Sequence, residues 1–107
     1  MTVLQSFQLN GKLALITGSS AGIGFALARA LGEAGAHVIL NGRNAEKVAA
    51  SASILQAEGL KISQSVFDVT NAQDVAEAVN KIEADVGAIE ILINNACLLY
   101  TSDAADE

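Results

Sequence analysis

Residues 17–24 of this chain read Thr17-Gly18-Ser19-Ser20-Ala21-Gly22-Ile23-Gly24, a glycine-rich segment from which the fold can be inferred. The apolar run before it, residues 13–16, is typical of a strand buried on both faces, and the residues after it repeat apolar side chains at helical spacing. N–H groups at the start of such a helix bind phosphate, and glycines allow the turn and the close approach of a ligand. The stretch therefore predicts a pyrophosphate-binding turn. Its candidate contacts are Gly18, Ser19, Ser20, Gly22, Ile23 and Gly24.

The glycine spacing is Gly-x-x-x-Gly-x-Gly, which differs from the commoner dinucleotide fingerprint Gly-x-Gly-x-x-Gly. The alternative interpretation is a helix-entry turn in which glycine serves only to pack the helix against the strand. The direct succession of strand, turn and helix favours phosphate binding.

Strands and helices alternate along the rest of the chain. Further strands are expected at residues 37–40, 62–69 and 89–93, and the more polar run 62–69 suits a place nearer an edge of the sheet. The order β-α-β-α-β-α-β predicts an α/β fold, a parallel sheet with helices on both faces.

Three helices are expected between these strands. The first covers residues 23–34 and turns Ile23, Leu27, Ala30, Leu31 and Ala34 inward. The second follows Asn44 as N-cap and ends before Gly59. The third starts at a capping box formed by Thr70 and Gln73 and is closed by Gly87. The expected inward residues of the last two are Val48, Ala52, Leu55, Val75, Val79, Ile82 and Val86.

The end of the second strand predicts which dinucleotide is bound. An acidic residue there holds the free 2′-hydroxyl of NAD, whereas an arginine accommodates the 2′-phosphate of NADP. The sequence has no acid at this place and instead reads Asn41-Gly42-Arg43. Arg43 can form a charge-assisted pair with a phosphate, which favours NADP(H) over NAD(H). The alternative is that Arg43 is a solvated loop residue.

Composition excludes several other classes of protein. The chain has 107 residues, of which 51% are hydrophobic and 17% charged, so the bulk of it is expected to fold as one domain. Its single cysteine excludes an internal disulfide, and its net charge of −6 argues against nonspecific binding to nucleic acid or anionic membrane. We find no signal peptide, membrane span or metal-ligand cluster in the sequence, so a cytoplasmic protein without a metal is expected.

Three motifs together resemble the short-chain dehydrogenase/reductase family, over residues 7–96. The glycine-rich turn is similar to the family's cofactor motif. Asp68 and Val69 resemble its acidic site beside the adenine ring, and Asn94-Asn95-Ala96 resembles the start of its Asn-Asn-Ala-Gly motif. The resemblance implies a Rossmann-like sheet and cofactor contacts from Asp68, Val69, Asn95 and Ala96. A plain turn residue at Asp68, and a purely structural role for the asparagines, remain open.

The resemblance also implies a reaction whose catalytic groups have no match in this sequence. Members of the family transfer hydride between a nicotinamide and a substrate carbon, using a serine and a tyrosine followed four residues later by a lysine. The single tyrosine, Tyr100, is followed at that spacing by Ala104, and no lysine comes after Lys81. We therefore expect no catalytic residue in this chain and no activity from it alone.

The residues after Ala96 depart from the family. Cys97 replaces the family's glycine, and residues 97–107 match the translation of a transposon-end sequencing adapter in one frame. We therefore expect a partial Rossmann domain at 1–96, truncated after the fourth strand, and a non-native read-through tail at 97–107. A natural acidic tail is the alternative. With the fourth strand at an edge, the fragment is expected to be marginally stable and to aggregate.

Within the family, three segments resemble gluconate 5-dehydrogenases: Phe7-x-Leu9-x-Gly11-Lys12, residues 38–43 and residues 66–70. The expected function is the cofactor-binding part of an NADP-dependent oxidoreductase that interconverts a secondary alcohol and a ketone, such as gluconate and 5-dehydrogluconate. Its partners would be a small-molecule substrate and, in the full-length parent, further copies of itself. The alternatives are a 3-oxoacyl-[acyl-carrier-protein] reductase-like enzyme and a non-catalytic dinucleotide-binding module. A methyltransferase using S-adenosylmethionine is disfavoured, since it needs no pyrophosphate contacts.

Overall fold

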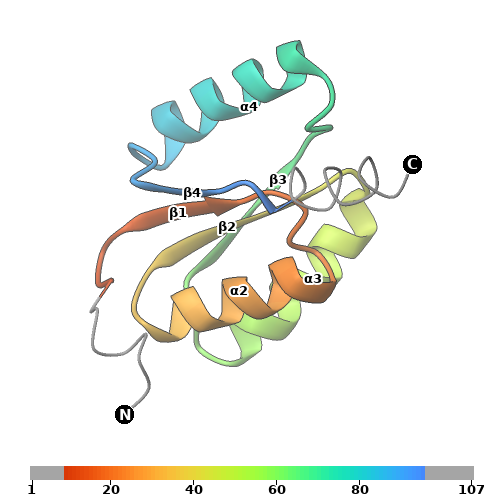
Figure 1. The fold of residues 1–107 in the computed structure, drawn as a ribbon. Coiled ribbons are helices and arrows are strands. Elements are labelled where there is room, and N and C mark those ends of the chain that lie inside the picture. Colours follow the sequence, from red (N-terminus) through yellow and green to blue (C-terminus); the bar gives the residue numbers. More distant parts are fainter. Residues whose placement is uncertain (1–8, 96–107) are drawn as a thin grey trace.

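A computed structural model of the chain describes residues 9–95, so Ala96 and the expected tail lie outside the described residues. Strands and helices alternate throughout this part, as the sequence predicts (Figure 1). The elements in chain order are β1 Leu13–Ile16, α2 Gly22–Glu33, β2 His37–Gly42, α3 Ala45–Ala57, β3 Ile62–Val66, α4 Ala72–Asp85 and β4 Ile91–Ile93.

The strands form one parallel sheet in the order β3-β2-β1-β4, which confirms the predicted α/β class. The more polar strand β3 lies at an edge, as expected. From β1 the chain first builds the β2 and β3 side, then returns to place β4 on the other side of β1. Strand order therefore reverses at β1, and open α/β sheets bind ligands beyond the carboxyl ends of the strands at such a point.

Helices cover both faces of the sheet, with α2 and α3 on one face and α4 on the other (Figure 1). The buried side chains of β1 alternate between them. Ala14 and Ile16 belong to the core under α2 and α3, whereas Leu13 and Leu15 belong to the core under α4. This division explains the continuous apolar run of β1, because a strand covered on both faces needs apolar residues at every position.

Helix α2 packs through its small residues, which the apolar spacing did not predict. Ile23 is 65% exposed and does not face the core, so its expected inward orientation is wrong. The buried positions of α2 are Gly24, Ala28, Leu31 and Gly32. A face of glycine and alanine brings the helix axis close to the sheet, and Ile23 then points away from it.

The cap of α3 is confirmed, and the cap of α4 is corrected. Asn44 accepts a hydrogen bond from Lys47 N. Helix α4, however, is capped by Asn71, whose side chain accepts from Asp74 N, and not by Thr70. The Thr70 hydroxyl instead donates to Asp68 Oδ1 at 2.7 Å, so it belongs to the turn before the helix. The same turn ends β3 at Val66, earlier than residue 69.

Candidate functional site

A cavity of about 720 Å³ lies at the carboxyl ends of the strands. This volume is within the range of small-molecule sites. Five predicted site residues line it, and they come from the turn after β1, the end of β2 and the turn after β3. They are Gly18, Ser20, Arg43, Asp68 and Val69; the other lining residues are Asn41, Gly42, Phe67, Thr70 and Asn94.

The turn after β1 has the backbone geometry of an anion site. Gly18 and Gly22 adopt φ values of 60° and 61°, which side chains other than glycine rarely tolerate. The N-cap of α2, Ala21, makes no side-chain hydrogen bond, and the first turn of α2 has no acidic residue. By contrast, α3 and α4 each have an asparagine cap and an acidic residue in the first turn. The positive end of the α2 dipole is therefore left for a ligand.

Gly24 allows α2 to approach this turn. A Cβ at this position would lie 2.5 Å from the Gly18 carbonyl oxygen and 2.8 Å from Asn95 Nδ2. A side chain at Gly24 would therefore collide with the backbone of Gly18, so this position requires glycine. A packing role for this glycine is compatible with phosphate binding at the same turn.

Ser19 and Ser20 have different environments. Ser19 is fully buried, and its hydroxyl donates to the Ile16 carbonyl at 2.7 Å and accepts from Asn41 N at 2.9 Å. Ser20 lines the cavity, and its carbonyl accepts a hydrogen bond from the Ser51 hydroxyl of α3. Of the two serines, only Ser20 therefore lines the cavity.

Arg43 and Asp68 line the same cavity from neighbouring strand ends. Asp68 is held by its own turn, because its Oδ1 accepts from both the hydroxyl and the N–H of Thr70. These two hydrogen bonds, and next the positive charge of Arg43, hold the pKa of Asp68 below its ordinary value. Asp68 is therefore an oriented, ionised acceptor at neutral pH. Val69 lines the cavity beside it and also packs against the core under α4.

The asparagines after β4 close the site on the β1 side. The Thr17 hydroxyl donates to Asn94 Oδ1 at 3.2 Å, and the buried Asn95 side chain donates from Nδ2 to the Gly18 carbonyl at 3.1 Å. Asn95 thus stabilises the glycine turn through its hydrogen bond to the Gly18 carbonyl. Ala96, the last predicted contact, lies outside the described residues.

Sequence reasoning missed Asn41 and Ser51. Both are buried, and each makes hydrogen bonds to the turn after β1. Asn41 lies in the segment 38–43 that carries the resemblance, but no cofactor contact was assigned to it, and Ser51 belongs to no motif. A polar residue at the end of an apolar strand is the local signal that could have pointed to Asn41.

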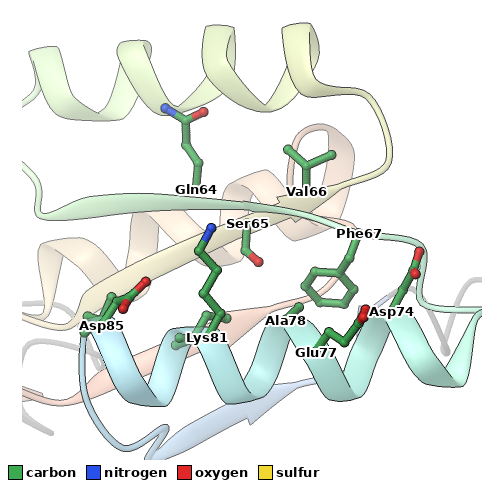
Figure 2. Close-up of a pocket in the computed structure, with 11 residues that line it drawn as sticks. Gln64, Ser65, Val66, Phe67, Asp74, Glu77, Ala78, Lys81 and Asp85 are labelled. Atoms are coloured by element: carbon green, nitrogen blue, oxygen red, sulfur yellow. The ribbon is translucent and has the colours of Figure 1, made fainter.

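A second cavity, of about 530 Å³, lies between β3 and α4 (Figure 2). The ring of Phe67 and the side chain of Lys81 project into the space between these elements. The charged residues that line it are Asp74, Glu77, Lys81 and Asp85. No predicted site residue lines this cavity, and it is separate from the carboxyl ends of β1 and β4.

No group of three or more histidine, cysteine, aspartate or glutamate side chains in residues 9–95 is placed to hold a metal ion. Among the helices described, none has the length and apolar character that crossing a membrane requires.

Comparison with known proteins gives consistent matches. The family model for short chain dehydrogenases matches residues 12–107. Gluconate 5-dehydrogenase of Gluconobacter oxydans is 54% identical over 90 residues, which cover 84% of this chain and 35% of that protein. The 5-keto-D-gluconate 5-reductase of Escherichia coli K12 is 44% identical over 90 residues, with the same coverage of 84% and 35%. The chain thus spans about a third of the length of these curated relatives.

Solved structures give similar matches. A gluconate 5-dehydrogenase from Burkholderia cenocepacia, in complex with NADP and tartrate, superposes with a TM-score of 0.77 and 48% identity. The match covers 85% of this chain and 36% of that one. L-sorbose reductase from Gluconobacter frateurii, complexed with NADPH and L-sorbose, gives a TM-score of 0.73 and 33% identity, covering 78% of this chain and 32% of that one.

Proposed function

The chain belongs to the short chain dehydrogenase family, and we propose that residues 1–96 are the NADP(H)-binding part of an oxidoreductase that interconverts a secondary alcohol and a ketone. The observation that carries this proposal is the single cavity that the glycine turn, Arg43 and Asp68 line together at the carboxyl ends of the strands. Residues 97–107 are proposed to take no part in binding.

The residues of the cavity fit a dinucleotide. The uncapped N-terminus of α2 would hold the pyrophosphate through its backbone N–H groups, and Ser20 would add a hydroxyl. The left-handed Gly18 would shape the turn without donating its own N–H, which is bonded to Asn41 Oδ1. Asp68 is an oriented acceptor suited to the amino group of adenine, with Val69 beside it. Asn95, Gly24 and Ser19 act by holding the turn, while Gly22, Ile23 and Ala96 are proposed contacts around it. When bound, the nicotinamide supplies or accepts the hydride.

Arg43 supports NADP(H) rather than NAD(H). It follows β2 directly, at the place where an arginine accommodates a ribose 2′-phosphate, and the carboxyl end of β2 has no acidic residue to hold a 2′-hydroxyl. The structures of two relatives were determined with NADP or NADPH, in agreement with this assignment.

The proposed substrate class is a sugar acid, with gluconate and 5-dehydrogluconate as the specific pair. The support is the similarity to two proteins named for that chemistry, at 54% and 44% identity. The chain of 107 residues is proposed to be inactive alone, because its one tyrosine, Tyr100, has no lysine after it. The parent protein is proposed to be a cytoplasmic homo-oligomer that acts on a small molecule.

The cofactor assignment is tested by substituting Arg43 with alanine and measuring the dissociation constants of NADPH and NADH by fluorescence titration. Loss of a charge-assisted pair with the 2′-phosphate is expected to weaken NADPH about tenfold or more and to leave NADH nearly unchanged. Lys81→Ala, which removes the same charge beside the other cavity, is the matched control. An equal loss for both cofactors would contradict the assignment.

Sequencing of the source DNA across and beyond codon 96 separates an oxidoreductase from a non-catalytic binding module. We expect the frame to continue through a glycine to a serine and a Tyr-x-x-x-Lys. A native frame that ends as residues 97–107 do would overturn both the read-through tail and the enzymatic function.

A further inference from the structure

Asn41 occupies an unusual place for a polar side chain. It lies in β2, one residue before the end of the strand, and is 1% exposed. The three residues before it in β2, Val38, Ile39 and Leu40, are all buried apolar side chains. A carboxamide in such surroundings costs free energy unless its donors and acceptor are all used.

The structure shows that they are used, and that the hydrogen bonds go to both sides of the strand. Asn41 Oδ1 accepts from Gly18 N at 2.9 Å, at the start of the glycine turn. Asn41 Nδ2 donates to the carbonyls of Ser65 and Phe67 at 3.1 and 3.2 Å. These carbonyls lie at the end of β3 and directly before Asp68.

The backbone of Asn41 adds two bonds to the same turn. Its N–H donates to the Ser19 hydroxyl at 2.9 Å, and its carbonyl accepts from Ser19 N at 2.8 Å. Asn41 is therefore joined to the turn after β1 by three hydrogen bonds and to the segment before Asp68 by two. Residues of both segments line the cavity: Gly18 and Ser20 from the first, and Phe67 and Asp68 from the second.

We propose that Asn41 is a positioning residue for the cofactor, which fixes the spacing between the glycine turn and the wall that contains Asp68. Asn41 acts through the backbone of Gly18 and Phe67, to which its side chain is hydrogen-bonded. The inference deepens the proposed function and rests on it. A bound dinucleotide would contact both the glycine turn and the turn that contains Asp68. Its affinity would then depend on whether the distance between these two turns is fixed before binding.

Only a carboxamide satisfies this arrangement. It offers one acceptor and two donors on a short side chain, whereas a carboxylate of the same shape has no donor. In the Asn41→Asp variant, one carboxylate oxygen would face the carbonyls of Ser65 and Phe67. Burial and these carbonyls raise the pKa of the introduced carboxyl, and its protonated form regains one donor. The charged groups that line the same cavity are Arg43, which opposes this increase, and Asp68, which adds to it.

The test compares the affinity of NADP⁺ at pH 8 and pH 5.5 by calorimetry, using the chain of 107 residues. At pH 8, Asn41→Asp is expected to weaken binding of NADP⁺ about tenfold relative to the unsubstituted chain. At pH 5.5 the ratio of the two dissociation constants is expected to be smaller. Asn80→Asp introduces the same charge at an exposed position of α4 and should match the unsubstituted chain at both pH values. Because each comparison is made at one pH, titration of the cofactor's own phosphate cancels.

Asn41→Ser provides a neutral second variant in case Asn41→Asp does not fold at pH 8. Its hydroxyl is too short to reach both carbonyls, so a similar loss of affinity that does not change with pH is expected. Circular dichroism melts of each variant separate stability from binding, since titrations are made well below the melting temperature.

The outcomes distinguish the inference from the function on which it rests. If the unsubstituted chain does not bind NADP⁺, the proposed function fails and the inference fails with it. If the unsubstituted chain binds while the Asn41 variants melt earlier but bind equally well, Asn41 is merely structural and the inference alone is overturned. A loss in Asn41→Asp that is the same at both pH values also overturns it.

Discussion

Gly24 affects both the packing of α2 and the geometry of the glycine turn, because it lies against the backbone of that turn. A methyl group there would lie 2.5 Å from the Gly18 carbonyl oxygen, a backbone atom that cannot move without moving the turn. We expect Gly24→Ala to lower the free energy of unfolding by about 1–3 kcal/mol, as overpacking does, and to weaken NADP(H) binding. Urea denaturation and a cofactor titration measure the two effects.

Gly32 provides a control in the same helix. A Cβ at Gly32 would lie 3.0 Å from Leu60 Cδ1, the far end of a flexible side chain, and alanine favours the helix by roughly 1 kcal/mol. Gly32→Ala should therefore change stability little and leave cofactor binding intact. Equal destabilisation by both substitutions would show that contact with the glycine turn is not what matters at Gly24.

At this scale the sequence predicted residues whose chemistry is visible locally and missed those defined by distant contacts. Gly18, Ser20, Arg43, Asp68 and Val69 stand at strand ends, so a parallel order of strands is enough to bring them to one cavity. The connections of Asn41 to Gly18 and Phe67 span 23 and 26 residues and depend on sheet register. A polar residue at the end of an apolar strand marks Asn41 as unusual, but the local sequence does not identify its distant partners.

The elements themselves were predictable because each helix and strand begins or ends at a recognisable residue. Asn44 caps α3 as expected. Three apolar runs predicted β1, β2 and β4, and the more polar run 62–69 predicted β3. The start of α4 was misplaced by one residue, because Thr70 and Asn71 are both good caps and the choice depends on Asp68. The orientation of Ile23 was wrong for a related reason: contact between α2 and the sheet is set by glycines, which a count of apolar residues ignores.

A histidine at the pairing of β2 with β3 makes the free energy of unfolding depend on pH. His37, the first residue of β2, contacts the Ser63 hydroxyl of β3 through Nε2 at 2.7 Å. Burial, and next the charge of Lys61, lower the pKa of His37 below 6.5. The unfolded chain, with the ordinary pKa, binds a proton first as the pH falls. The free energy of unfolding is therefore expected to decrease from pH 6.5 downward until the folded-state pKa is reached, and to be unaffected by His37 above pH 7.

His37→Gln retains a polar contact to Ser63 and removes the titration. The drop in melting temperature between pH 7.5 and pH 5.5 should be smaller in this variant than in the unsubstituted chain. Identical drops would mean that the carboxylates alone account for the pH dependence.

Across the whole molecule, the two faces of the sheet are covered unequally. Helices α2 and α3 lie on one face, while α4 is the one helix of the described part on the other (Figure 1). In residues 9–95, β4 pairs with β1 alone and so presents an open edge. Leu92 of β4 is in register with Leu15, which is buried under α4, yet Leu92 is 63% exposed. An apolar side chain beside an open strand edge favours pairing with another chain.

Self-association of the chain is therefore expected to depend on this edge rather than on exposed apolar surface in general. Leu92→Lys should lower the apparent mass in sedimentation velocity at high protein concentration, because a lysine at an edge strand opposes pairing. Ile54→Lys makes the same change at a residue of α3 that is 52% exposed, so it alters net charge equally and leaves the edge untouched. If both variants reduce association to the same extent, charge alone is responsible. If only Leu92→Lys does so, association occurs through β4, and the carboxyl-end cavity is not the surface that holds the copies together.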